Sequence, residues 1–90
     1  NGIKAEAFYE KASHHAYRRY DFDGAMQIMS QKALALDPSY QDGWYRMAEW
    51  SFLSGKLAEC KKNAAKAQAM DPFDQRSTTL LKQCRSRSEE

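Results

Sequence analysis

The sequence predicts an all-α protein built from repeated pairs of helices. Two Asp-Pro pairs, Asp37-Pro38 and Asp71-Pro72, lie 34 residues apart. Each follows a segment of the same shape, Ala-Leu-Ala-Leu before the first and Ala-Gln-Ala-Met before the second. A period of this length is typical of stacked helical units. Between the breaks, apolar residues recur at steps of three and four, the spacing of one helical face. We therefore expect a single domain over residues 1–90 with five helices.

Composition agrees with one small folded domain. The chain has 90 residues, of which 42% are hydrophobic and 12% aromatic, as in a chain that forms a cooperative core. Fourteen basic and twelve acidic residues give a net charge of +2. So small an excess argues for no nucleic-acid or membrane partner in particular. We interpret the basic ridges on the last two helices as solvated surfaces; they consist of Lys61, Lys62 and Lys66 on one helix and of Lys82, Arg85 and Arg87 on the other.

The first two helices are expected on either side of a break at residues 20–24. Small and apolar residues mark one face of the first helix, which should run from Ile3 to about Tyr20. Asp23 is expected to cap the second helix, which should continue to Leu36. Asp37-Pro38 should end it, because proline restricts the residue before it and has no N–H to donate.

The third helix is expected to open at Ser39, which with Asp42 resembles a capping box. Ser54-Gly55 should end it. Its inner face is expected to carry Trp44, Met47, Ala48 and Ser51.

The fourth helix should run from about Lys56 to Met70, where Asp71-Pro72 stops it. Asp74 is expected to cap a shorter last helix. That helix should turn three residues inward: Leu80, Leu81 and Cys84.

One irregularity distinguishes the two halves. From Ala25 to Pro38 is 13 residues, whereas the matching interval from Cys60 to Pro72 is 12. One added residue rotates everything after it in a helix by about 100°. We therefore predict a local bulge or a tightened turn within Met29–Ala33; the alternative is that the pairing of the helices merely slides.

The cysteines and histidines offer no site. Cys60 and Cys84 are few and far apart, so reduced thiols are expected, with Cys60 an inert buried thiol. His14 and His15 point about 100° apart on a helix and cannot bind one metal ion together, so we expect no metal and no cofactor. The segment Asn1-Gly2-Ile3-Lys4 lacks the core of a signal peptide, which favours a cytoplasmic or otherwise intracellular location.

The pattern resembles the tetratricopeptide repeat, a helix-turn-helix of about 34 residues. The second unit matches as Trp44-x2-Met47-Ala48-x2-Ser51, then Cys60-x3-Ala64, then Pro72. The first matches as Tyr9-x2-Ala12-Ser13-x2-Ala16, then Ala25-x3-Met29, then Pro38. The resemblance implies a right-handed α-α superhelix of five antiparallel helices. Its parts would be repeat 1 at about 6–40, repeat 2 at about 41–74 and a capping helix at about 75–87.

The resemblance also implies a function, because tetratricopeptide proteins are mostly scaffolds that hold a partner's peptide or helix in a concave groove. The groove is lined by the first helix of each unit. The corresponding residues here are Ala7, Glu10, Lys11, His14, Tyr17, Arg18, Asp42, Tyr45, Arg46, Glu49, Phe52, Leu53, Arg76, Thr79, Leu80 and Gln83. Trp50 stands where the repeat usually has a small residue, and we expect it to fill a gap against the first helix rather than to lie exposed as an anchor.

The family's chaperone-binding groove grips a terminal carboxylate, and its positions correspond to Glu10, His14, Arg46, Arg76 and Leu80. Of the basic residues that this groove requires, only Arg76 is kept, and Glu10 would repel the carboxylate, so we expect no binding of a chaperone tail. A protein or peptide ligand remains the expected partner.

Two further classes of function are weighed beside the scaffold. Self-association is the main alternative, because the first helix has no preceding repeat to cover Phe8, Ala12 and His15. Nucleic-acid binding is less well supported, since acidic residues are interspersed among the basic ones. We do not expect an enzyme, because no nucleophile has a base at usable spacing and the chain has only four glycines.

Overall fold

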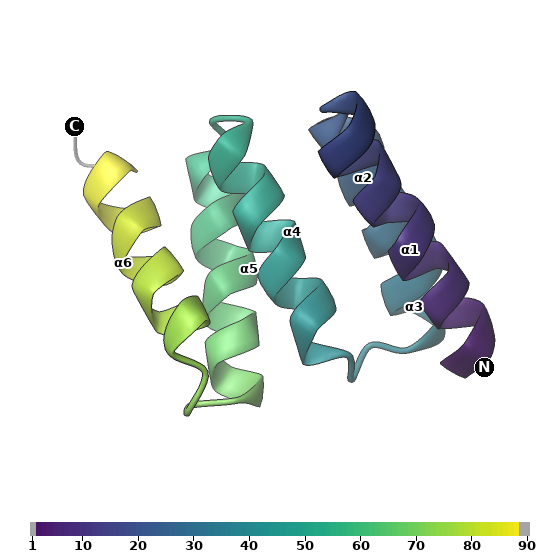
Figure 1. Ribbon diagram of the computed structural model, residues 1–90. Helices are drawn as coiled ribbons and strands as arrows, with labels where there is room; N and C mark the ends of the chain where they lie inside the picture. Colours follow the sequence, from purple (N-terminus) through teal and green to yellow (C-terminus); the bar gives the residue numbers. More distant parts are fainter. Residues whose placement is uncertain (1, 89–90) are drawn as a thin grey trace.

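Two helical hairpins and one closing helix follow each other along the chain (Figure 1). The computed structural model describes residues 2–88, and the side chains of residues 4–87. Over the described residues the fold is all-α, with five helices and no strand. The second helix consists of three consecutive segments, one of them a π-helix, η1. The bounds are α1 Gly2–Arg19, α2 Phe22–Ile28, η1 Met29–Ala33, α3 Leu34–Leu36, α4 Gln41–Leu53, α5 Leu57–Met70 and α6 Gln75–Ser88.

The two Asp-Pro turns have the same backbone. Asp37 has φ −142° and ψ 82°, and Asp71 has φ −142° and ψ 89°. The N–H of Asp37 donates to the carbonyl of Ala33 at 3.0 Å, and that of Asp71 donates to Ala67 at 3.1 Å. Each aspartate carboxylate then accepts from the N–H two positions later, at 3.3 and 3.1 Å. Both aspartates lie outside the α-helical region, as a following proline favours, so the predicted helix stops at both pairs are confirmed.

The predicted irregularity in the second helix is confirmed. The segment η1 is a π-helix of five residues, Met29–Ala33, between two α-helical stretches. A π-turn accommodates one residue more than an α-turn, because its hydrogen bonds run from residue i+5 to residue i. The extra residue is therefore taken up locally, and both Met29 and Ala33 remain buried.

The start of the second helix differs from the prediction. Asp21, not Asp23, is its N-cap, and its Oδ1 accepts from the N–H of Gly24 at 3.0 Å. Asp23 lies in the first turn and pairs with Lys56 at 2.6 Å. The second helix begins two residues earlier than expected because the chain already turns at Tyr20, which has a left-handed backbone with φ 54°. Tyr20 is 77% exposed, so it does not belong to the packed face of α1.

The capping prediction fails for α4 and is confirmed for α6. Tyr40 is the N-cap residue of α4 and makes no side-chain capping bond. The Oγ of Ser39 instead donates to the carboxylate of Asp37 at 2.6 Å, so the preceding turn uses it. At α6 the Oδ1 of Asp74 accepts from the N–H of Arg76 at 3.1 Å, as an N-cap does.

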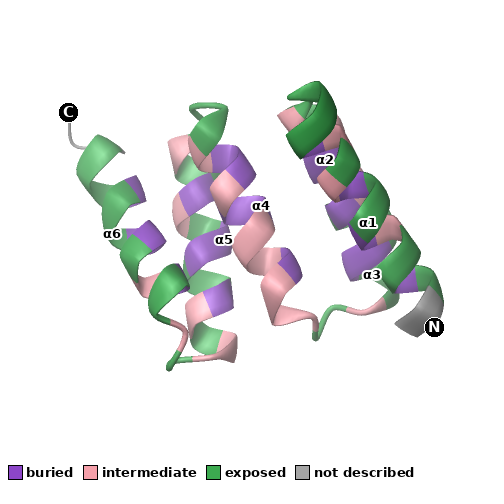
Figure 2. Cartoon of the chain, viewed as in Figure 1, coloured by how far each residue is buried: buried purple, intermediate pink, exposed green. Residues whose placement is uncertain are grey.

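The buried residues form two clusters with α4 between them (Figure 2). The first joins the N-terminal hairpin to α4 and contains Ala5, Tyr9, Ala12, Ala16, Ala25, Met26, Met29, Ala33, Leu34, Met47 and Trp50. The second joins α4 to α5 and α6 and contains Ala48, Cys60, Ala64, Leu80, Leu81 and Cys84. Trp50 is fully buried, edge-on to the ring of Tyr17 in α1 at 6.2 Å between centroids, which confirms that it fills a gap. The inward face predicted for the last helix is also confirmed.

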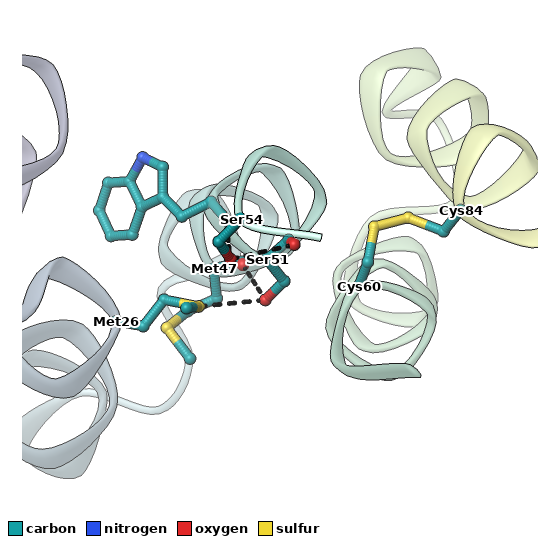
Figure 3. The surroundings of a disulfide bond; sticks show 7 residues. Met26, Met47, Ser51, Ser54, Cys60 and Cys84 are labelled. Carbon is teal, nitrogen blue, oxygen red and sulfur yellow. Dashed lines mark hydrogen bonds between the residues drawn. A yellow bond between two sulfur atoms is a disulfide. The ribbon is translucent and has the colours of Figure 1, made fainter. Parts of the chain in front are cut away.

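The expectation of reduced thiols is wrong. Cys60 of α5 and Cys84 of α6 form a disulfide, with their Cα atoms 5.9 Å apart (Figure 3). Sequence spacing could not show this, because the two cysteines, 24 residues apart, meet only when α5 and α6 pack side by side. Disulfides are typical of oxidising compartments, so this pairing does not favour the expected intracellular location.

The uncovered face predicted for α1 is also not as expected. Ala12 is fully buried, and Phe8 and His15 are partly buried. The second helix covers this side of α1, because its Ala25 and Met29 belong to the same cluster as Ala12. The argument for self-association through that patch therefore loses its structural basis.

Candidate binding groove

A groove of about 510 Å3 lies between α4 and α6. We call it the α4–α6 groove. Its lining combines apolar, aromatic, polar and charged side chains: Tyr45, Glu49, Phe52, Leu53, Gln75, Arg76, Thr79, Leu80 and Gln83.

Helical geometry decides which residues of α4 reach the groove. Tyr45, Glu49 and Phe52 are spaced by four and three residues, so they share one face of the helix. Ala48, one position from Glu49, points about 100° away and is fully buried in the second cluster. One helix thus presents a packed face to the core and a partly exposed face to the groove.

The groove also contains an exposed apolar patch. Leu53 is 54% exposed, and Phe52 and Tyr45 are only partly buried against the second cluster. Leu80, on the opposite wall, is 7% exposed and joins the patch to the core. Aromatic and aliphatic side chains with nearby arginine have the composition of a recognition surface.

Charged groups beside the groove pair with one another. Glu49 accepts hydrogen bonds from the hydroxyls of Tyr17 and Tyr45 and from Arg46, so its carboxylate connects α1 with α4. Arg46 also pairs with Asp42 at 3.5 Å. Burial and the bond to Glu49 both raise the pKa of Tyr17, which keeps its hydroxyl protonated as a donor.

Arg76, in the first turn of α6, lines the groove at the end nearest the start of that helix. Its guanidinium lies 4.3 Å from the centroid of the Tyr45 ring and pairs with Asp42 and Asp74, each at 3.1 Å. The salt bridge to Asp42 ties the start of α6 to the start of α4, residues 34 positions apart in sequence.

Asp74 anchors the start of α6 below the groove. Its side chain is 8% exposed and accepts from Arg76, from Gln41 at 2.7 Å and from Ser77 at 2.8 Å. Burial alone would raise its pKa, but these hydrogen bonds outweigh burial and hold the pKa well below its usual range. The carboxylate is therefore ionised at neutral pH and fixes the spacing between α4 and α6.

The groove continues toward the C-terminal end of α6. A smaller depression of about 260 Å3 shares Phe52 and Gln83 with the groove and is otherwise lined by Ser86 and Arg87. The guanidinium of Arg87 lies 5.3 Å from the centroid of the Phe52 ring, a cation–π contact.

The structure brings together the part of the predicted set that lies on α4 and α6. Eight predicted residues line the groove: Tyr45, Glu49, Phe52, Leu53, Arg76, Thr79, Leu80 and Gln83. Tyr17, Asp42 and Arg46 border it through their bonds to Glu49 and Arg76. Five predicted residues on α1 are exposed and are not part of its lining: Ala7, Glu10, Lys11, His14 and Arg18.

Sequence reasoning missed Gln75 in the lining, and it missed Gln41 and Arg87. The helical stripe through Arg76 and Thr79 passes beside Gln75, so the stripe could have included it. The role of Gln41 had no local signal, because its partners Asp74 and Ser77 are 33 and 36 residues away. Arg87 was assigned to a solvated ridge and instead contacts Phe52.

In the described part of the chain, no group of three or more His, Cys, Asp or Glu side chains is arranged to hold a metal ion. None of the helices described is both long enough and apolar enough to cross a membrane.

Comparison with known proteins identifies no relative: no family model matches the chain, and no curated protein matches it.

Proposed function

We propose that this chain is a non-catalytic interaction module of the tetratricopeptide type, which binds a partner's peptide or helix in the α4–α6 groove. The observation that carries the proposal is the groove lining, in which Tyr45, Phe52 and Leu53 lie partly exposed beside arginine. A patch of this kind loses water on binding, and burial of apolar area is the main favourable contribution to association.

The repeat geometry supports the tetratricopeptide part of the proposal. The turns at Asp37 and Asp71 have matching dihedral angles and hydrogen bonds at a separation of 34 residues. The π-helix η1 absorbs the one residue by which the first unit exceeds the second. A superhelix of two such units with α6 as its cap would place α4 and α6 on the concave side.

The chemistry of the lining favours binding over catalysis. The carboxylate of Glu49 is held by three donors, and the guanidinium of Arg76 by two carboxylates. Groups fixed in this way position neighbouring residues. We assign no cofactor and no catalytic role to the groove.

Capture of partners by the immobilised chain tests the proposal. We expect the double substitution Phe52→Ala and Leu53→Ala to remove the captured proteins, because it deletes the apolar patch. Phe73→Ala is the matched control, since Phe73 is 92% exposed and lies outside the groove lining. Circular dichroism should show that both variants remain folded. An identical captured set for the double variant and the wild type would refute the groove as the binding site.

Self-association remains the alternative proposal, although the burial of Ala12 removes its original support. Light scattering at two concentrations separates it from the scaffold. A particle that stays monomeric at both concentrations eliminates self-association, and a mass that doubles with concentration supports it.

A further inference from the structure

Most charged groups of the α4–α6 groove already pair with an oppositely charged side chain of the same protein, whereas Arg87, beyond its end, pairs with none in the described part of the chain. At the end nearest the start of α6, three carboxylates, those of Asp42, Glu49 and Asp74, form ion pairs of 3.1–3.5 Å with two guanidinium groups, those of Arg46 and Arg76. The carboxylates are in excess by one, so this end does not attract an incoming carboxylate, and Arg76 is already paired. The structure thus adds a second argument against a grip on a terminal carboxylate at Arg76.

Arg87, at the C-terminal end of α6, differs from Arg46 and Arg76. Within residues 2–88 its guanidinium makes a cation–π contact with the ring of Phe52, and no carboxylate pairs with it. Its side chain is exposed and lines the depression that continues the groove. A guanidinium has five N–H donors in a planar fork that matches a carboxylate. A cation–π contact uses the charge of the guanidinium and not its N–H donors, so these donors can still bind a carboxylate.

Helix geometry fixes the distance between this cation and the apolar patch. Leu80 and Arg87 are seven residues apart on α6, which is about 10 Å along the axis and within about 20° of the same face. A segment in the extended polyproline II conformation rises about 3.1 Å per residue with three residues per turn, so side chains three positions apart share one face and lie about 9 Å apart. A side chain inserted beside Leu80 would thus place the residue three positions away next to Arg87.

The groove and the depression beyond it form a long, narrow line of contacts. The lining on α6 extends from Gln75 to Gln83, about 12 Å of helix, and continues to Arg87 through the shared residues Phe52 and Gln83. A segment lying along this line in an extended conformation contacts the apolar patch and Arg87 together.

We propose that Arg87 makes the groove selective for an extended protein segment in which a carboxylate follows or precedes an apolar anchor by three positions. The anchor inserts between Phe52 and Leu80, and the carboxylate pairs with Arg87. The inference rests on the proposed binding function of the groove and adds the chemical class of its ligand.

Selection from a random library of displayed 12-residue peptides tests this directly. The immobilised 90-residue chain is compared with three variants. Arg87→Gln removes the cation, Arg87→Lys keeps the charge, and Lys82→Gln removes an exposed charge elsewhere on α6. Thermal unfolding should show that all of the variants are folded.

We expect wild type and Lys82→Gln to enrich peptides with Asp or Glu three positions from an apolar residue. Arg87→Gln should still enrich the apolar residue without the acidic one, and Arg87→Lys should keep part of the preference. In a selected peptide, changing that Glu to Gln should weaken binding to the wild type about two- to fivefold, as expected for an exposed ion pair, and should leave binding to Arg87→Gln unchanged. Amidation of the peptide's C-terminus should have no effect.

Two other outcomes have distinct meanings. Enrichment of apolar residues with no acidic preference, or with the same preference in Arg87→Gln, would overturn the role of Arg87 while the groove remained a binding site. If no peptide is enriched, or if enrichment survives the double substitution Phe52→Ala and Leu53→Ala, the proposed function fails and this inference fails with it.

Discussion

The hydroxyl of Tyr17 in α1 donates a hydrogen bond to Glu49 in α4 and accepts one from Arg46 at 3.2 Å. This contact joins the two hairpins beside the groove, 32 residues apart in sequence. It also holds the carboxylate that Tyr45 contacts from the other side. The orientation of α4 relative to α1 therefore depends in part on one phenolic hydroxyl.

Tyr17→Phe should lower the free energy of unfolding by about 1 kcal/mol, because the charged Glu49 loses a donor at a half-exposed site. Tyr20→Phe is the matched control, since Tyr20 is 77% exposed and should be neutral. Urea unfolding followed by circular dichroism measures both. Equal stability of the two variants would show that the hydroxyl does not stabilise the junction.

Because the π-helix η1 accommodates one extra residue, the protein should tolerate deletion of a residue from it. Removing Gln31, which is exposed, should convert Met29–Ala33 to a regular α-helix and restore the 12-residue interval of the second unit. We expect a change in stability within about 1–2 kcal/mol. Deleting Lys62 from the regular helix α5 should cost more, because it rotates the buried Ala64 and Ala67 by about 100°. Thermal unfolding of the two deletion variants measures this difference in stability. If deletion of Gln31 lowers stability as much as deletion of Lys62, the extra residue is not accommodated locally in η1.

The disulfide between Cys60 and Cys84 should stabilise the packing of α6 on α5. Its residues are 24 apart, so chain-entropy arguments predict a contribution of about 3 kcal/mol. The double substitution Cys60→Ala and Cys84→Ala should lower the unfolding free energy by that order, with α6 the most affected. Thiol titration of the oxidised, denatured chain should find no free cysteine, and two reactive thiols would disprove the bond.

Protonation of Asp74 in acid should lower the free energy of unfolding. Its pKa is lowered in the folded state, so it contributes stability above the ordinary aspartate pKa of about 3.9 and loses that contribution as the pH falls further. Asp74→Asn should reduce stability at pH 7 and flatten the decline below pH 4. Unfolding midpoints measured from pH 7 to pH 2 test this, with Asp71→Asn as the control, because the Asp71 carboxylate accepts from the N–H of Phe73 at an exposed site. Parallel acid profiles for wild type and Asp74→Asn would refute the role of Asp74.

The raised pKa of Tyr9 predicts that stability also decreases at alkaline pH. Burial, with the nearby Asp37 and Tyr40, raises the pKa of Tyr9 to about 12. A raised pKa contributes stability that is complete below the ordinary value of about 10 and is lost as the pH rises toward 12. Tyr9→Phe should remove this part of the alkaline decline, measured by unfolding midpoints from pH 8 to pH 11. An unchanged decline would contradict it.

Features with a local cause were predictable from the sequence. The helix stops at Asp37-Pro38 and Asp71-Pro72 follow from proline, and the irregularity within Met29–Ala33 follows from counting one extra residue. The cap at Asp21 was missed because Asp21 and Asp23 are equally good caps, and the left-handed backbone of Tyr20 decides between them.

The site shows the same division between local and long-range causes. The stripe on α4 was predictable from helical spacing, and its facing wall on α6 was predictable from the repeat. The disulfide, the ties of Asp74 to Gln41 and the contact of Arg87 with Phe52 depend on how separate helices pack. The spacing of these residues along the sequence does not predict these contacts.

The most direct test of the groove is a map of a bound peptide on the folded chain. The most enriched displayed peptide is titrated into the 15N-labelled protein, and backbone and side-chain amide shifts are followed by NMR. The account predicts that the largest shifts fall on Phe52, Leu53, Thr79, Leu80 and Gln83, with little change at Phe73 or along α2. Shifts concentrated outside α4 and α6, with the groove residues unmoved, would contradict it.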